Sequence, residues 1–303
     1  MTVAIDVKGL RKSYGSLEAV SGVDLQIEAG EVFALLGPNG AGKTTTVEIL
    51  EGYRRRDAGE VSVLGFDPAR RERALKQRIG IVLQSTGIEQ FLTVAEVIEM
   101  YRGYYPDPRP LDEIIDVVGL NEKRDERVKK LSGGQQRRLD VAIGLAGDPE
   151  LLFLDEPTTG FDPAARRRMW DAVKNLASLG KTIFLTTHYM DEAQELANRV
   201  AVISAGRIVA EGPPSSLAGR ETSHTIVRFK LPERAPALPR SLKRSAMRGG
   251  RVQIEAADPV KVLHELTGWA LEKGVTIDEL EVARPTLEDA YLKLTGGEAE
   301  AAE

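Results

Sequence analysis

The sequence predicts an α/β protein built on a mixed, mainly parallel sheet and followed by a small α+β domain. Three short apolar runs, at 31–37, 150–156 and 182–188, end in glycine, acidic residues or histidine and are typical of strands buried on both faces. Helical patterns lie between these runs; the stretch 111–120, for example, repeats its apolar residues at helical spacing and stops near Gly119. This alternation favours a parallel sheet covered by helices.

Two further stretches predict antiparallel strands, because their apolar and polar residues alternate. One is the opening 30 residues, and the other is 199–214, with a turn near Ala205 and Gly206. Two prolines and a polar stretch follow, so we place a domain boundary near residue 220.

We therefore expect a large domain over residues 1–218, with a helical subdomain over about 85–145, and a small α+β domain over 221–296. The remaining segment, 297–303, is short and acidic, and we expect it to form a frayed tail. The small domain is expected to contain three strands and two helices. The strands are expected at 224–231, 251–256 and 275–282, and the helices at 259–274 and 286–296.

Composition excludes several kinds of function. The chain has no cysteine, which rules out disulfides, thiolate metal sites and a cysteine nucleophile. A net charge of −5 gives no general attraction to nucleic acid or to anionic lipid. No apolar run approaches the ~18 to 20 residues of a membrane span, and the start lacks the pattern of a secretory signal. We expect a cytoplasmic protein that would reach a membrane only through a partner.

The segment LLGPNGAGKTTT, at 35–46, predicts a phosphate-binding loop (P-loop). It fits the pattern G-x-x-x-x-G-K-[ST] between a buried strand and a helix, where glycines let backbone N–H groups turn toward phosphate oxygens. Lys43 is expected at the β- and γ-phosphates and Thr44 on Mg²⁺. The expected nucleotide-binding residues of this loop are Gly37, Pro38, Asn39, Gly40, Ala41, Gly42, Lys43, Thr44 and Thr45.

Two adjacent acids end the strand at 150–156. Asp155 would face the same crevice as the P-loop and suits a Mg²⁺ ion, directly or through water. Glu156 could accept a proton from an attacking water. The alternative for Glu156 is a solvated acid at a strand end.

A second glycine pair opens the helical stretch at 131–150, and Ser132 is expected to be its N-cap. The residues alone allow two interpretations, a second anion-binding helix N-terminus or an ordinary capped helix.

The segments GPNGAGKT, LSGGQ and LLFLDEP, in this order, resemble the nucleotide-binding subunit of an ATP-binding-cassette (ABC) transporter over about residues 3–218. The resemblance implies a P-loop NTPase cassette that binds ATP and Mg²⁺ and pairs head to tail with a second copy. The signature segment of each copy would then complete the other copy's ATP site. Its residues are Ser132, Gly133, Gly134 and Gln135.

Four more positions are implied by the resemblance. Tyr14 would stack on adenine, although a partly buried strand tyrosine explains it equally well. Gln84 would sense Mg²⁺ and water and link the site to the membrane subunit, and Asp162 would lie in a loop that crosses the dimer interface. His188 would contact the γ-phosphate and orient the attacking water, so the catalytic set is Glu156, His188, Gln84 and Lys43, and the metal set is Thr44, Gln84 and Asp155.

The ending RPTLEDAYLKLTG, at 284–296, resembles the daunorubicin-type drug-resistance branch of bacterial exporters. This implies an ATPase motor peripheral to the cytoplasmic face of the membrane, driving a separate integral membrane permease that exports drugs or lipid-like compounds. No nucleic-acid partner is expected. The alternatives are a soluble ABC ATPase acting on ribosomes or DNA, and a sensor with an inactive cassette, which is disfavoured because every catalytic position is filled.

Overall fold

The structure is a computed structural model that describes residues 2–82, 87–217, 225–232, 235–239, 241–242, 244–248, 251–283, 286–287 and 291. It divides into two compact units, Met1–Pro214 and Ser215–Glu303, at a point a few residues before the boundary expected near residue 220. Gln84, most of the helix expected at 286–296 and the tail 297–303 lie outside the described residues.

A six-stranded mixed sheet forms the centre of the first unit, with the order β5-β6-β7-β3-β8-β9. Its strands are β3 (Val32–Leu36), β5 (Ile79–Val82), β6 (Leu151–Asp155), β7 (Thr182–Thr187), β8 (Arg199–Ser204) and β9 (Arg207–Gly212). Neighbouring strands are parallel except for β8 and β9, which are antiparallel. The predicted mixed sheet is therefore confirmed, as is the turn between β8 and β9, where Ala205 and Gly206 both have positive φ.

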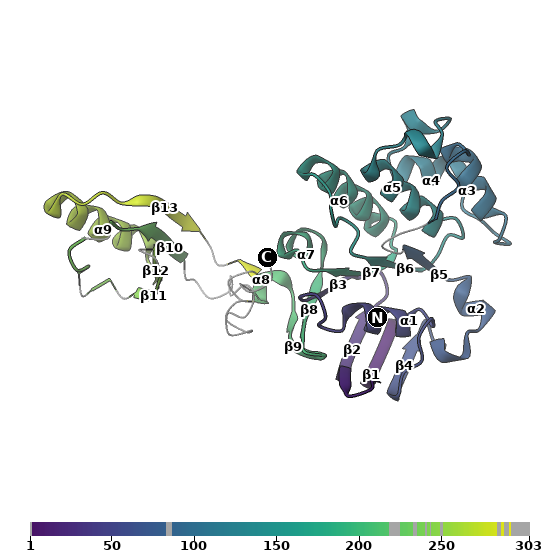
Figure 1. Ribbon diagram of the computed structural model, residues 1–303, viewed down its shortest axis with the longest axis horizontal. Helices are drawn as coiled ribbons and strands as arrows, with labels where there is room; N and C mark the ends of the chain where they lie inside the picture. Colours follow the sequence, from purple (N-terminus) through teal and green to yellow (C-terminus); the bar gives the residue numbers. More distant parts are fainter. Residues whose placement is uncertain are drawn as a thin grey trace. The chain divides into compact units, whose positions relative to one another are not determined.

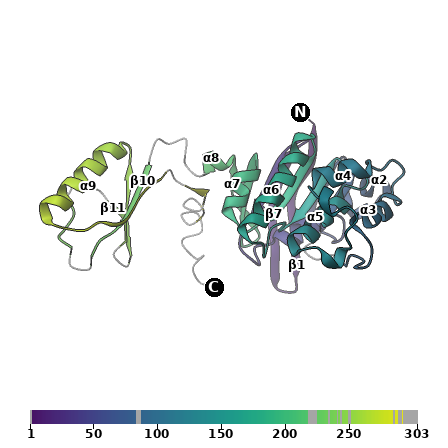
Figure 2. The ribbon, with the colours of Figure 1, turned by 90° about the horizontal axis from the view of Figure 1, so that it is seen from above.

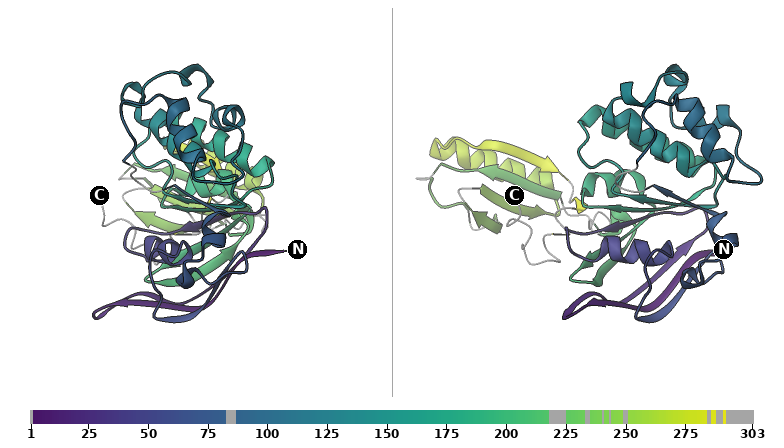
Figure 3. Two further views of the ribbon diagram at one scale, coloured as in Figure 1. Left: turned by 90° about the vertical axis from the view of Figure 1, so that its right-hand side faces the viewer. Right: turned by 45° about the vertical axis from the view of Figure 1, so that its right-hand side comes forward.

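An antiparallel sheet of β1 (Val3–Tyr14), β2 (Leu17–Glu28) and β4 (Ala58–Val63) faces this central sheet, with β1 in the middle. Helix α1 (Lys43–Leu50) lies between the two sheets (Figures 1 and 3). Apolar side chains from α1 and from both sheets form one buried core, including Phe33, Phe153 and Phe184. This core fixes the start of α1, and with it the P-loop, against the end of β3.

Helices α5, α6 and α7 lie on the opposite face of the central sheet, and α3, α4 and α5 group together (Figures 1 and 2). Their bounds are α3 (Val94–Arg102), α4 (Leu111–Val117), α5 (Gly133–Gly144), α6 (Pro163–Ser178) and α7 (Met190–Leu196). The shorter elements are η1 (Pro68–Arg70), α2 (Arg73–Lys76), η2 (Asn121–Lys123), η3 (Val128–Lys130) and α8 (Pro214–Leu217). Within the described part of the chain, no helix is both long enough and apolar enough to cross a lipid bilayer.

The second unit is an antiparallel sheet in the order β11-β12-β10-β13, with α9 packed on one face (Figure 2). Its elements are β10 (Thr225–Lys230), β11 (Arg244–Arg248), β12 (Arg251–Ala256), α9 (Pro259–Lys273) and β13 (Asp278–Ala283). The sequence reading missed β11. Its segment RSAMR carries no β-branched or aromatic residue, so only pairing with β12 makes it a strand.

Candidate active site

Three neighbouring parallel strands bring the candidate residues to one edge of the central sheet. Strand β7 lies between β3 and β6, and all three run in the same direction. The P-loop follows β3, Asp155 is the last residue of β6, and His188 directly follows β7. The carboxyl ends of parallel strands form the usual ligand crevice of an open α/β sheet.

The P-loop backbone has room only for glycine at two places. A Cβ on Gly42 would lie 2.3 Å from the carbonyl oxygen of Ala19, and one on Gly37 would lie 2.4 Å from that of Ile203. Gly42 is also the N-cap of α1, with φ of 102°, and provides no side-chain cap to the first turn. The N–H groups of that turn are thus free to bind phosphate oxygens, so the loop fits a nucleotide.

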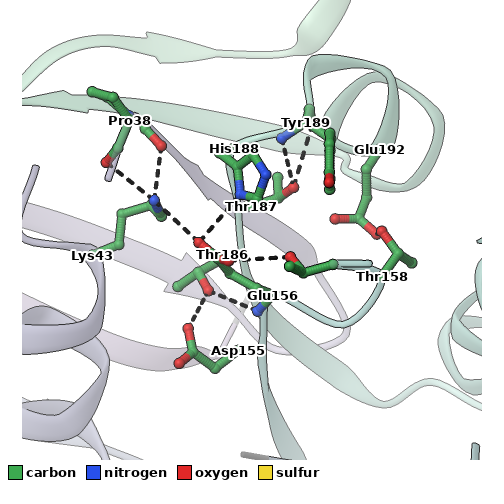
Figure 4. A network of polar contacts seen from close by, with 12 residues as sticks. Pro38, Lys43, Asp155, Glu156, Thr158, Thr186, Thr187, His188, Tyr189 and Glu192 are labelled. Atoms are coloured by element: carbon green, nitrogen blue, oxygen red, sulfur yellow. Dashed lines mark hydrogen bonds and ion pairs between the residues drawn. The ribbon is translucent and has the colours of Figure 1, made fainter. Parts of the chain in front are cut away.

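Lys43 is buried inside this loop, with its side chain 4% exposed. Its Nζ donates hydrogen bonds to the carbonyl oxygens of Gly37, at 2.8 Å, and Pro38, at 3.2 Å. The same Nζ lies 3.3 Å from Oε1 of Glu156 (Figure 4). The Lys43 ammonium group is therefore held at the expected phosphate site by two carbonyl oxygens and a carboxylate, which the oxygens of a bound phosphate could replace.

Glu156 lies at the centre of the contacts in Figure 4. Nδ1 of His188 is 3.3 Å from its Oε1, and Thr159 Oγ1 donates to its Oε2 at 3.1 Å. Burial favours a raised pKa for Glu156, but the Lys43 charge and the contacts with His188 and Thr159 outweigh it, so the pKa is lowered. The residue is thus a carboxylate near neutral pH.

Asp155 is held by a threonine of the neighbouring strand. Thr186 Oγ1 donates to Oδ1 of Asp155 at 2.5 Å and accepts from the backbone N–H of Glu156 at 3.1 Å. No cluster of three or more His, Cys, Asp or Glu side chains in the described residues could hold a metal by itself. One carboxylate and the exposed Thr44 hydroxyl are nevertheless the donor set that suits Mg²⁺, which takes most other ligands from phosphates and water.

The signature segment begins α5, and Ser132 is its N-cap, as predicted. Gln135 N–H donates to Ser132 Oγ at 3.3 Å, and Ser132 N–H donates to Gln135 Oε1 at 2.8 Å. Gly133 and Gly134 line a cavity of about 660 Å³, and Glu156 and Asp162 line it too. Within one copy, the signature segment and the acidic end of β6 therefore open onto one space.

Asp162, which was expected in a loop that crosses the dimer interface, has a structural role within the chain. It caps α6, because its Oδ1 accepts from the N–H groups of Ala164, at 2.9 Å, and Ala165, at 2.8 Å. These bonds, the one from Ala165 first, lower the pKa of Asp162. The carboxylate is exposed at the cavity, so capping α6 leaves it accessible.

Tyr14 lies at the end of β1, away from the Glu156 network. The residue is 40% exposed, and Arg54 Cζ and Lys12 Nζ lie 5.2 Å and 5.8 Å from the centroid of its ring. An exposed ring flanked by cations can accept an adenine, but the described contacts do not join it to the P-loop.

The sequence reading missed a buried polar group behind His188. Glu192 on α7 is fully buried, and its Oε1 accepts from Thr158 Oγ1 at 2.7 Å and Trp170 Nε1 at 3.3 Å. Burial raises the pKa of Glu192 although these bonds act in the opposite direction. The threonines that bond Glu192, Thr158 and Thr187, come from the segments DEPTTG and FLTTH, but neither segment by itself points to Glu192.

Comparison with known proteins gives consistent results along the chain. Residues 20–159 match the family model "ABC transporter", and 225–286 match a model for the C-terminal domain of ABC transporter domain-containing proteins. A "Nod factor export ATP-binding protein I" of Rhizobium sp. (strain N33) is 39% identical over 98% of this chain and 99% of its own length. The "Daunorubicin resistance ATP-binding protein DrrA3" of Streptomyces coeruleorubidus is 37% identical over 97% of this chain and 96% of its own.

A solved structure of a dimeric ATP-binding cassette, in a post-hydrolysis state bound to ADP and Pi, superimposes with a TM-score of 0.61. It is 25% identical and covers 69% of this chain and 98% of its own.

Proposed function

Because the chain belongs to the ABC transporter family of ATP-binding proteins, we propose that it is the ATP-hydrolysing motor subunit of an exporter. One observation carries the proposal: Lys43, Glu156 and His188 converge within 3.3 Å contacts at the edge where the P-loop meets the ends of β6 and β7. A phosphate-binding loop, a carboxylate and an imidazole at one point can bind a terminal phosphate, accept a proton from the attacking water and orient that water.

Glu156 is the proposed general base, and its strength depends on what Lys43 binds. Lys43 and His188 hold the pKa of Glu156 below its ordinary value. Phosphates of ATP would draw the Lys43 ammonium toward themselves, which removes one of these charges and makes the carboxylate a better proton acceptor. His188 would then orient the attacking water, while Mg²⁺, held through Thr44 and Asp155, would neutralise phosphate charge.

The proposed working form is a dimer, in which the signature segment of one copy completes the ATP site of the other. Ser132 starts α5 beside an open cavity, so the N-terminus of that helix is accessible to a nucleotide held by another chain. The likeness to a dimeric cassette supports this arrangement.

The proposed partner is an integral membrane permease, which the motor would serve from the cytoplasmic side. Similarity to proteins named for Nod factor export and daunorubicin resistance supports export of a drug or lipid-like molecule. These relatives also favour export over action on ribosomes or DNA, the alternative left open by the sequence.

The test is co-expression of the full chain with candidate permeases, followed by purification from membranes and measurement of ATPase activity with a panel of drugs and lipids. We expect co-purification with a permease and stimulation of ATPase activity by a subset of compounds. A Lys43→Ala control should still co-purify but should show no stimulated activity. A chain that hydrolyses ATP but binds no membrane protein would contradict the exporter role.

A further inference from the structure

The proposed base, Glu156, has a backbone conformation that the chain would not adopt unaided. Its φ is +46°, in the left-handed region that L-residues other than glycine seldom occupy. It also precedes Pro157, and a residue before proline normally favours extended conformations. Such a conformation persists only where surrounding groups hold it in place.

Both ends of the peptide that enters Glu156 are held by hydrogen bonds. The N–H of Glu156 donates to the carbonyl oxygen of Thr186, at 3.2 Å, and to its Oγ1, at 3.1 Å. The carbonyl oxygen of Asp155, on the same peptide, accepts from Nη2 of Arg137 at 2.7 Å. Nε of Arg137 donates to the carbonyl oxygen of Pro157 at 3.4 Å, so one guanidinium bonds the carbonyl oxygens of the residues before and after Glu156.

We propose that Arg137 is a positioning residue for hydrolysis, which acts by holding Glu156 in register with the phosphate site. The proposal rests on Glu156 being the base, as argued above. An arginine suits this task because its planar fork can bond two carbonyls at once, which a lysine ammonium on its stem does poorly.

A plain structural explanation would make Arg137 a partner of Asp140 on the same helix. Arg137 does interact with Asp140, with 3.7 Å between Nη1 and Oδ2, but its Nη2 and Nε donate to the carbonyl oxygens of Asp155 and Pro157. Arg137 is buried and lines the same cavity as Glu156 and the signature segment. The helix that presents Ser132 to a partner's nucleotide thus also holds the base of its own copy.

The experiment compares Arg137→Met and Arg137→Lys in the full chain by ATP binding and by single-turnover ATP hydrolysis. We expect ATP affinity near that of the unaltered protein, but a hydrolysis rate lower by up to about 100-fold for Met, because catalytic groups tolerate little displacement. Lys should restore part of the rate. Arg138→Met is the matched control, because Arg138 on the same helix donates to the carbonyl oxygens of Val118 and Gly119, away from Glu156.

A double substitution separates positioning from general damage. In a Glu156→Gln background, Arg137→Met should cause no further loss of rate, since both changes act through one group. The role of Arg137 would be overturned if the double variant lost the rate factors of both single variants multiplied together. It would also be overturned if Arg137→Lys kept the unaltered rate and melting curve, a result that stands even if Arg137→Met did not fold. If Glu156→Gln itself kept its rate, the proposed base would fail instead, and the two failures are distinct.

Discussion

Replacing Glu156 with glutamine should slow hydrolysis and tighten ATP binding at the same time. The amide cannot accept a proton, and loss of a general base costs about 100-fold or more in rate. It also removes the negative charge that holds Lys43 at 3.3 Å in the absence of phosphate.

The gain in ATP affinity can be estimated from this ion pair. At 3.3 Å and an effective dielectric constant of about 20, the attraction is about 5 kcal/mol before desolvation. Desolvation of two buried charges offsets most of this, leaving about 1 kcal/mol. Freeing Lys43 should therefore lower the Kd for ATP about fivefold.

The assay pairs titration of a fluorescent ATP analogue with phosphate release at saturating ATP. Glu150→Gln is the matched control, since Glu150 precedes the same strand but pairs with Arg78 at its other end. Turnover near that of the unaltered protein in a folded, ATP-binding Glu156→Gln variant would refute the reasoning. So would weaker ATP binding.

Two further predictions concern stability. Glu192→Ala should lower the free energy of unfolding, measured by chemical denaturation, by about 2–5 kcal/mol, because the donors of Thr158 and Trp170 lose their buried acceptor. Glu192→Gln keeps an acceptor oxygen and should cost less than about 1 kcal/mol, so equal losses in the two variants would contradict this prediction. The two hydrogen bonds from Arg56, at 2.8 and 2.9 Å, lower the pKa of Asp67. The stability that this ion pair contributes should be complete above the ordinary aspartate pKa, near about 4, and should be lost as the pH falls below it. The difference in melting temperature between the unaltered protein and Asp67→Asn should therefore shrink below about pH 4, and a difference that stays constant would argue against a stabilising Arg56–Asp67 pair.

The central sheet could be predicted because its strands are short apolar runs that only a doubly covered sheet can bury. The same reasoning placed the P-loop, Asp155 and His188 at one edge, since parallel strands expose their carboxyl ends together. Family membership confirms the resemblance inferred from the motifs.

What the sequence did not reveal depends on pairing across space. Strand β11 gains its conformation from β12, and the bonds of Arg137 to the peptides around Glu156 join residues about 20 positions apart. The burial of Glu192 likewise could not be predicted, because no local pattern shows that α6 and the segment after β6 cover it. Such contacts follow from tertiary packing and leave no periodic signal.

Sharing of each ATP site between two copies is the central claim, and a mixing experiment tests it directly. Ser132→Arg and Glu156→Gln copies should each be inactive alone. If sites are shared, each mixed dimer carries one site with both changes and one site with neither. Random mixing makes half of the dimers mixed, so about a quarter of the activity should return. Shared sites would be contradicted if no activity returned in mixtures where mixed dimers are shown to form. Full activity of Ser132→Arg alone would contradict them too.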